Sequence, residues 1–337
     1  MRDNWKVKGG GSEEMRKGVE VIALSLSLTV IAIALIAVSS AGTQPVYPKP
    51  KYNIDGNLSD WGVDLTGNWS LNETWVPNDG IEFIVENNYD PNTPTYAWNY
   101  GLTQDSRFQG VHIRGTAPNY TVYDEPVVWC GGAVSAYVAE PYQGEKYDLE
   151  AKYLDQDDNY IYVAIVTSVP PNATGVDAPG DLGLDIDRNA STGEWGYEYG
   201  VKLGTNTGLT QWEIGYLPDW KPNYVIKDNS PGIFKDYLPP SGGKTGEAIG
   251  AYVQGPTCTE GPFMDRGKPT YIIEMAIPKS AVGVTGYLSQ GMIHHTDACG
   301  NDTIDNPIPE FMTVVIPAAA LICFVFFIHW RRWSGGK

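Results

Sequence analysis

Basic residues are scarce in this sequence, which has 23 lysines and arginines against 40 aspartates and glutamates in 337 residues. The formal net charge is −17 at pH 7. Residues 1–42 and 311–337 together hold eight of the basic residues but only four of the acidic ones, so the middle is more acidic still. Nucleic acids and anionic surfaces bind proteins through basic patches. The charge balance therefore argues against a nucleic-acid partner.

Cysteine is also scarce, with four in the chain. Cys323 lies inside an apolar run near the C-terminus, which leaves Cys130, Cys258 and Cys299. In an oxidising compartment, three thiols give one disulfide and one odd cysteine, or a bond to another chain. We favour a disulfide between Cys258 and Cys299 because both lie in the last third of the chain, and the sequence leaves the other pairings open.

Catalytic signatures are missing. The sequence has no Gly-x-Ser-x-Gly, no His-Glu-x-x-His, no P-loop and no glycine-rich dinucleotide motif. Acidic pairs are numerous, but a glycosidase is recognised by the separation of two carboxylates, which the sequence does not give. The histidine cluster at residues 294–299 lacks the further ligands that zinc prefers. We therefore predict that the protein is not an enzyme.

Long amphipathic helical patterns are absent between the two ends of the chain. Short segments rich in β-branched and aromatic residues alternate instead, which is typical of half-buried strands. The predicted strands are residues 81–86, 109–114, 133–140, 148–155, 160–168, 181–187, 196–203, 208–216 and 271–277. Residues 149–169 should form a hairpin, and residues 87–106 and 217–244 long loops. This pattern predicts an all-β, antiparallel β-sandwich over residues 54–308.

An apolar run at residues 19–38 precedes this body. It follows five basic residues and is followed by the small residues Ser39, Ser40 and Ala41, an order typical of a secretory signal. Its length also suits an uncleaved anchor. We predict a signal peptide or N-terminal membrane anchor at residues 1–42, followed by a proline-rich linker at residues 43–53.

A second apolar run, residues 312–330, ends directly before Arg331 and Arg332. Its length approaches the roughly 20 residues that a membrane-spanning helix needs. The paired arginines favour a cytoplasmic tail. The sequence thus predicts a body flanked by two transmembrane helices, with the ectodomain extracellular.

The tripeptide Pro309, Glu310 and Phe311 stands just before the second run. The order of tripeptide, apolar run and basic stub resembles the archaeal PEF-type C-terminal sorting signal, here over residues 309–337. The resemblance implies cleavage at the motif by an archaeosortase and attachment of the body to a membrane anchor. An ordinary transmembrane anchor is the alternative.

Four segments of the body also follow the order of a known module. They are residues 52–61, which contain Ile54-Asp55-Gly56 and Asp60-Trp61, then residues 154–164, 185–199 and 271–278. Together they resemble family 9 carbohydrate-binding modules and their DOMON-like relatives over residues 52–278. The resemblance implies a jelly-roll-like sandwich that binds glycan. Residues 299–302 resemble a segment that recurs in anchored archaeal surface proteins.

Seven Asn-x-Ser/Thr sequons favour a glycoprotein, because an exported chain with so many acceptors is expected to be modified at several. They lie at Asn57, Asn68, Asn72, Asn119, Asn172, Asn189 and Asn301.

Asp185, Asp187 and Asn189 place oxygen ligands at alternate positions, and Glu194 or Glu198 can return a further carboxylate. Calcium takes six to eight oxygen ligands, so this segment predicts a calcium site built from Asp185, Asp187, Asn189 and Glu198. The spacing is not that of an EF-hand. A solvated acidic strand end is the alternative.

Trp195, Trp212 and Trp220 are candidates for stacking on sugar rings, since an aromatic face offers apolar area beside a polar rim. Large aromatic side chains are more often core residues, and we assign Trp61 to the core. We predict an exported, membrane-anchored surface protein whose non-catalytic body binds glycan or envelope components. The alternatives are a structural envelope subunit with no soluble ligand and, less favoured, a surface hydrolase.

Overall fold

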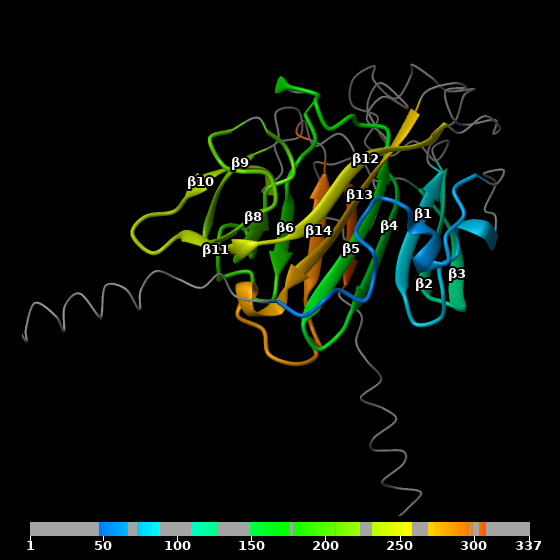
Figure 1. The fold of residues 1–337 in the computed structure, drawn as a ribbon, viewed down its shortest axis with the longest axis horizontal. Helices are drawn as coiled ribbons and strands as arrows, with labels where there is room; N and C mark the ends of the chain where they lie inside the picture. The colour runs from blue at the N-terminus through cyan, green and yellow to red at the C-terminus, as the bar shows by residue number, and fades with distance from the viewer. Residues whose placement is uncertain are drawn as a thin grey trace, which may run out of the picture. The chain divides into compact units, whose positions relative to one another are not determined.

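The computed structural model describes residues 47–66, 73–87, 109–126, 149–175, 178–205, 207–222, 231–257, 269–296, 298 and 303–307. The chain divides into two units, Met1–Pro48 and Lys49–Lys337, and every element below belongs to the second. The described part is all-β with antiparallel pairing (Figure 1), which confirms the predicted all-β, antiparallel class of fold. Within it, no helix is long and apolar enough to cross a membrane. Both predicted spans lie outside the described residues.

The larger sheet has seven strands in the order β12-β13-β5-β4-β1-β2-β3. Its strands are β1 (Glu82–Asn87), β2 (Gln109–Thr116), β3 (Asn119–Pro126), β4 (Leu149–Gln156), β5 (Tyr160–Thr167), β12 (Ile249–Thr257) and β13 (Pro269–Pro278). The pairing of β4 with β5 confirms the predicted hairpin.

The second sheet has six strands in the order β11-β8-β7-β6-β14-β15. They are β6 (Leu182–Asp185), β7 (Tyr199–Val201), β8 (Glu213–Tyr216), β11 (Gly243–Glu247), β14 (Met292–Thr296) and β15 (Thr303–Pro307). A separate hairpin pairs β9 (Pro218–Pro222) with β10 (Pro231–Tyr237). The short 3₁₀ helices η1 (Leu58–Trp61), η2 (Glu73–Trp75) and η5 (Lys279–Val282) lie in the connections.

The two large sheets share one hydrophobic core. Leu154 and Val163 from the seven-stranded sheet and Leu184 and Ile214 from the six-stranded sheet belong to a single buried cluster. Burial of an aliphatic side chain of this kind stabilises the fold by about 1.5–3 kcal/mol. The sequence provides these residues at every second strand position, which places them on the facing surfaces.

A buried lysine crosses this core. Lys152 Nζ, from β4, donates to the carbonyl oxygens of Ile293 at 2.6 Å and Ile304 at 2.7 Å. Burial lowers the pKa of Lys152 to about 7. The side chain thereby ties β14 and β15 to the opposite sheet.

The outer face of the seven-stranded sheet is also covered, so β4 and β5 are buried at every position rather than half-buried. The cover is the segment before β1, in which Tyr52 stacks on Trp61 with ring centroids 4.2 Å apart. Trp61 is fully buried and lies against Tyr153 of β4. Its assignment to the core is confirmed. The segment called a linker thus contributes Tyr52 to the packed body.

One buried carboxylate holds this cover in place. Glu274 of β13 accepts hydrogen bonds from the backbone N–H groups of Asp55 at 3.0 Å and Gly56 at 2.7 Å. Its other oxygen accepts from Trp61 Nε1 at 2.8 Å. The first and last motifs of the resemblance, far apart in sequence, therefore meet at one side chain.

The outer face of the six-stranded sheet is covered by the hairpin of β9 and β10, so the prediction of a loop over residues 217–244 is wrong where the structure describes it. The sheet offers a glycine row, Gly183, Gly200 and Gly215, which lie opposite one another in register on β6, β7 and β8. Added Cβ atoms would lie 2.9 Å from Trp220 at Gly200 and 2.3 Å from Phe234 at Gly215. The aromatic rings of the hairpin therefore pack directly against these glycines. Proline and glycine are rare in strands, so the prolines and glycines of the hairpin made its two strands hard to predict from the sequence.

Candidate functional site

Three carboxylates converge where β6 ends and β7 begins. Asp185 closes β6, Glu198 precedes β7, and Asp187 lies in the loop between them. One oxygen from each lies within 4.8 Å of the others. Leu184 of β6 pairs with Tyr199 of β7, which brings the adjacent residues Asp185 and Glu198 together at this end. We call Asp185, Asp187 and Glu198 the carboxylate cluster.

Backbone N–H groups of the loop hold the cluster. Ile186 N donates to Glu198 Oε2 at 2.8 Å, and Arg188 N donates to Asp185 Oδ1 at 2.6 Å. Arg188 itself has φ of 56° and sits in the left-handed region, so the loop turns sharply here. The backbone of the loop thus hydrogen-bonds to the carboxylates, which an acidic strand end that contacts only solvent would not do.

The hydroxyl of Thr192 lies between two members of the cluster. Its Oγ1 is 2.6 Å from Glu198 Oε1 and 3.0 Å from Asp187 Oδ1. Burial raises the pKa of Asp185 and of Glu198, although the N–H donors work in the opposite direction. The raised pKa values mean that burial makes the charged form of these carboxyls costly, and a bound divalent cation would relieve that cost.

Two other residues of the predicted calcium site have different positions. Asn189 is exposed, and its Oδ1 accepts from Ser191 N at 3.1 Å, which closes a local turn. Glu194, the alternative to Glu198, accepts at Oε2 from Trp220 N at 2.9 Å, on the covering hairpin. Of the two glutamates, the structure brings Glu198 to the aspartates.

The three candidate tryptophans have different surroundings. Trp220 is 2% exposed and packs against Phe234, so it is a core residue rather than a sugar platform. Trp212 is half-buried against the main core, and a Cβ on Gly250 would lie 2.3 Å from its ring. Trp195 is half-buried in the loop of the carboxylate cluster, with φ of 58°.

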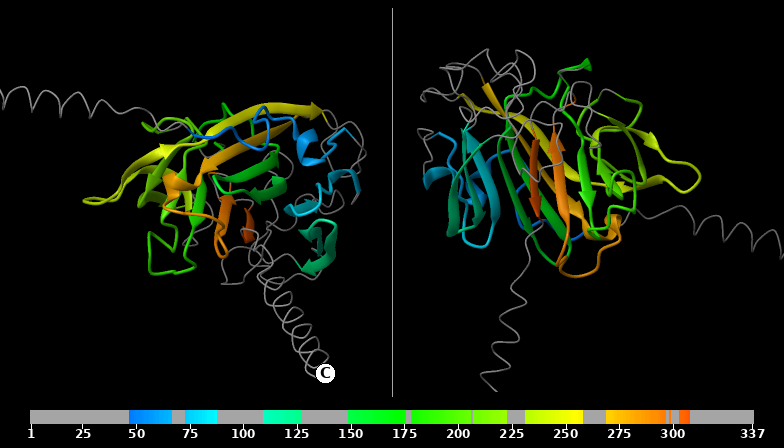
Figure 2. Two further views of the ribbon diagram at one scale, coloured as in Figure 1. Left: turned by 60° about the horizontal axis from the view of Figure 1, so that its bottom comes forward. Right: turned by 180° about the vertical axis from the view of Figure 1, so that it is seen from behind.

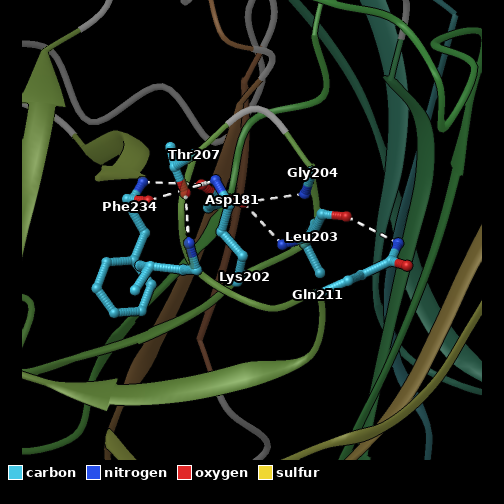
Figure 3. A network of polar contacts seen from close by, with 8 residues as sticks. Asp181, Lys202, Leu203, Gly204, Thr207, Gln211 and Phe234 are labelled. Atoms are coloured by element: carbon cyan, nitrogen blue, oxygen red, sulfur yellow. Dashed lines mark hydrogen bonds and ion pairs between the residues drawn. The ribbon is translucent and has the colours of Figure 1, made fainter. Parts of the chain in front are cut away.

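A second charged site lies at the other end of β6 and β7, deep under the hairpin (Figure 3). Asp181 Oδ2 is 2.7 Å from Lys202 Nζ, and both side chains are fully buried. Asp181 Oδ1 accepts from Leu203 N at 2.7 Å and Gly204 N at 3.2 Å, and Oδ2 accepts from Phe234 N at 2.8 Å. Burial raises the pKa of Asp181, against the opposing effect of Lys202. The pair joins the sheet to the hairpin, a structural role that the sequence argument missed.

The remaining predicted residues divide by position. The asparagines of four sequons are described and exposed, as an acceptor must be: Asn57, Asn119, Asn172 and Asn189. Outside the described residues lie Asn68, Asn72, Asn301, Cys258, Cys299, Pro309, Glu310 and Phe311. The glycosylation and disulfide assignments stay predictions.

Comparison with known proteins identifies the type of signal in the C-terminal segment. Residues 308–332 match the PEF-CTERM archaeal protein sorting domain. The match confirms the sorting signal and indicates an exported protein held at the cell surface through a membrane anchor that an archaeosortase processes. No curated protein matches the chain, and no solved structure does.

Proposed function

We propose that the chain is exported, processed at Pro309, Glu310 and Phe311, and tethered to the outer face of the membrane as a non-catalytic β-sandwich. The match of residues 308–332 to the sorting domain carries this proposal. Two further features support it. The N-terminal run at residues 19–38 has the order of a secretory signal, and the shared core of the two large sheets suits a jelly-roll-like sandwich.

The mature C-terminus tests the tether. Membranes of cells that express the full chain are fractionated, and the protein is analysed by intact-mass spectrometry. We expect a body that lacks residues 312–337, and retention of those residues in a variant with Pro309→Ala, Glu310→Ala and Phe311→Ala combined. Thr313→Ala, outside the motif, is the matched control and should be processed normally. A wild-type protein that still carries residues 312–337 overturns the proposal.

The carboxylate cluster supports a second proposal, a calcium site in which Asp185, Asp187 and Glu198 supply ligands. The convergence of three carboxylates within 4.8 Å favours it. Calcium should raise the melting temperature of the detergent-solubilised chain, and Asp187→Asn should abolish that rise. Asp158→Asn, at the exposed β4–β5 turn, is the control and should keep it. An equal calcium response in both variants excludes this site.

The sign of the pH dependence sharpens this test. A carboxyl whose pKa is raised on folding favours the fold below its unfolded pKa, and that contribution is lost as pH rises through the folded value. Burial raises the pKa of Asp185 and Glu198, so without calcium they should lower stability from pH 4 to pH 7. The gain in melting temperature with calcium should therefore be larger at pH 7 than at pH 4.

The ligand of the body is proposed from the module resemblance as glycan or a neighbouring envelope component. Trp195, half-buried beside the carboxylate cluster, is its best aromatic candidate. A glycan-binding screen of the solubilised chain, with and without calcium, tests the first option. Binding that Trp195→Ala abolishes supports it, and absence of binding in both conditions leaves the structural envelope subunit.

A further inference from the structure

Almost no chain separates the folded body from its sorting signal. Strand β15 ends at Pro307, and the sorting-domain match begins at residue 308. The apolar run starts at Met312, so four residues intervene. Even fully extended they span about 14 Å at most, at roughly 3.3–3.6 Å per residue.

Strand β15 cannot serve as a flexible stalk because it is built into the body. Ile304 is fully buried in the main core and its carbonyl accepts from Lys152 Nζ at 2.7 Å. Asp305 Oδ1 is 2.7 Å from His294 Nδ1 of the neighbouring strand. These contacts continue to within two residues of Pro307.

The exit of β15 can be placed at one end of the body. Pro307 pairs with Met292, the first residue of β14, so the loop of residues 283–291 lies at the same end. Gln156 Nε2, at the end of β4, donates to Leu288 O of that loop at 2.9 Å. The β4–β5 turn therefore lies there as well, next to the loop (Figures 1 and 2).

The body also begins at this end. Lys51 Nζ lies 2.6 Å from Asp155 Oδ2, one residue before the end of β4. Both connections of the body to the predicted membrane segments thus start from the same side. Resting this end on a bilayer requires neither connection to wrap around the body.

We propose that the end formed by residues 157–159, residues 283–291 and the exit of β15 lies directly on the lipid surface, without a stalk. We call it the membrane-proximal end. This inference rests on the tether of the proposed function and adds an orientation to it. The carboxylate cluster lies at the same end, because Met292 pairs with both Pro307 and Asp185.

Charge gives the membrane-proximal end no strong attraction to anionic headgroups. Its exposed charged groups include two acidic residues, Asp158 and Asp187, and two basic residues, Lys51 and Arg188. The tether supplies the proximity instead. Contact should therefore depend on the length of chain after Pro307 more than on salt.

Reaction with a large maleimide-polyethylene glycol tests the orientation in intact cells that express the full chain. Ser289→Cys places a thiol on an exposed position of the membrane-proximal end. Gln254→Cys is the matched control, because Gln254 is exposed and pairs with Tyr271 at the far end of β13. Tyr271 is seven residues from Pro278, about 24 Å along a strand at ~3.4 Å per residue. The parent chain gives the background of its four native cysteines.

We expect Ser289→Cys to react several-fold more slowly than Gln254→Cys. Twelve glycine and serine residues inserted after Pro307 add about 20 Å of mean reach and should make the two rates equal. Thr285→Cys, exposed on the same loop, should repeat the result and guards against a misfolded first variant.

The outcomes separate the two proposals. Equal rates in a chain that fractionates with membranes overturn the orientation and leave the tether intact. A chain found in the medium overturns the tether itself. Slow reaction at Ser289→Cys that the inserted spacer does not change also overturns the orientation, since shielding must then come from something other than the membrane.

Discussion

The two outer faces of the body are covered in different ways. The seven-stranded sheet is covered by the segment before β1, held at Glu274 by three N–H donors. The six-stranded sheet is covered by the β9–β10 hairpin, in which Phe234 donates its backbone N–H to Asp181 and accepts at its carbonyl oxygen from Lys202, the partner of Asp181. Each cover is fixed by a buried carboxylate that accepts backbone hydrogen bonds.

The difference lies in charge and in packing. Asp181 has a buried cation beside it, whereas the donors to Glu274 are neutral. The first cover brings its own aromatic stack of Tyr52 on Trp61, and the second places its rings where glycines leave room. The first cover packs through its own large side chains, whereas the second packs where the sheet has glycines without side chains. The two contacts can be tested separately.

The largest effect is expected at the buried ion pair. Lys202→Met leaves Asp181 as an uncompensated charge, which should destabilise the fold by about 3–5 kcal/mol. Urea unfolding of the solubilised chain measures it. The exposed pair of Lys235 and Asp219 on the hairpin is the matched control, and Lys235→Met should cost at most ~1 kcal/mol. Similar losses in the two variants would mean that burial does not set the strength of the pair.

A smaller effect is expected at Glu274, whose three hydrogen-bond donors are neutral. Glu274→Gln cannot accept from all three donors, and one unsatisfied N–H should cost about 1–3 kcal/mol. Burial raises the pKa of Glu274, so its contribution to stability falls as pH rises above the ordinary range of a glutamate. The difference between wild type and variant should therefore be greatest in acid and shrink towards neutral pH. A difference that grows from pH 4 to pH 7 contradicts this account.

The smallest effect is expected in the glycine row. A Cβ on Gly200 would lie 2.9 Å from the Trp220 ring, so Gly200→Ala must shift the hairpin slightly. We expect a loss of about 1 kcal/mol, at the low end for overpacking by one methyl group. Gly243→Ala on β11 is the control, because nothing lies within 4 Å of its added Cβ. If thermal unfolding shows equal changes, the row does not seat the hairpin.

The sequence located strands best where β-branched and aromatic residues run together. Strand β13 and the β4–β5 hairpin lie at their predicted positions because β5 and β13 are nearly continuous apolar runs of this kind. Strands β9 and β10 lie in the segment predicted as a loop, because proline, glycine and polar residues interrupt them. Tertiary contact with the glycine row compensates for their weak propensity.

The candidate site was predicted only in part. The sequence prediction named Asp185, Asp187, Asn189 and Glu198, and the structure brings three of them, Asp185, Asp187 and Glu198, within 4.8 Å of one another. Calcium binding there stays a prediction. Trp220 is buried because it packs against Gly200 and Phe234, contacts that the sequence does not reveal. A charged residue flanked by strand residues, as Lys202 is, was the one available signal for the buried pair.

The sequence by itself determined the class of fold and the localisation at the cell surface. Both are local properties: strand alternation over a few residues, and a C-terminal signal recognised by its order along the chain. The tertiary structure alone decided how the two faces are closed, that the three carboxylates of the cluster converge, and that β15 ends at the sorting signal on the same side as the start of the body. Those features depend on contacts between residues up to hundreds of positions apart, which local patterns do not encode.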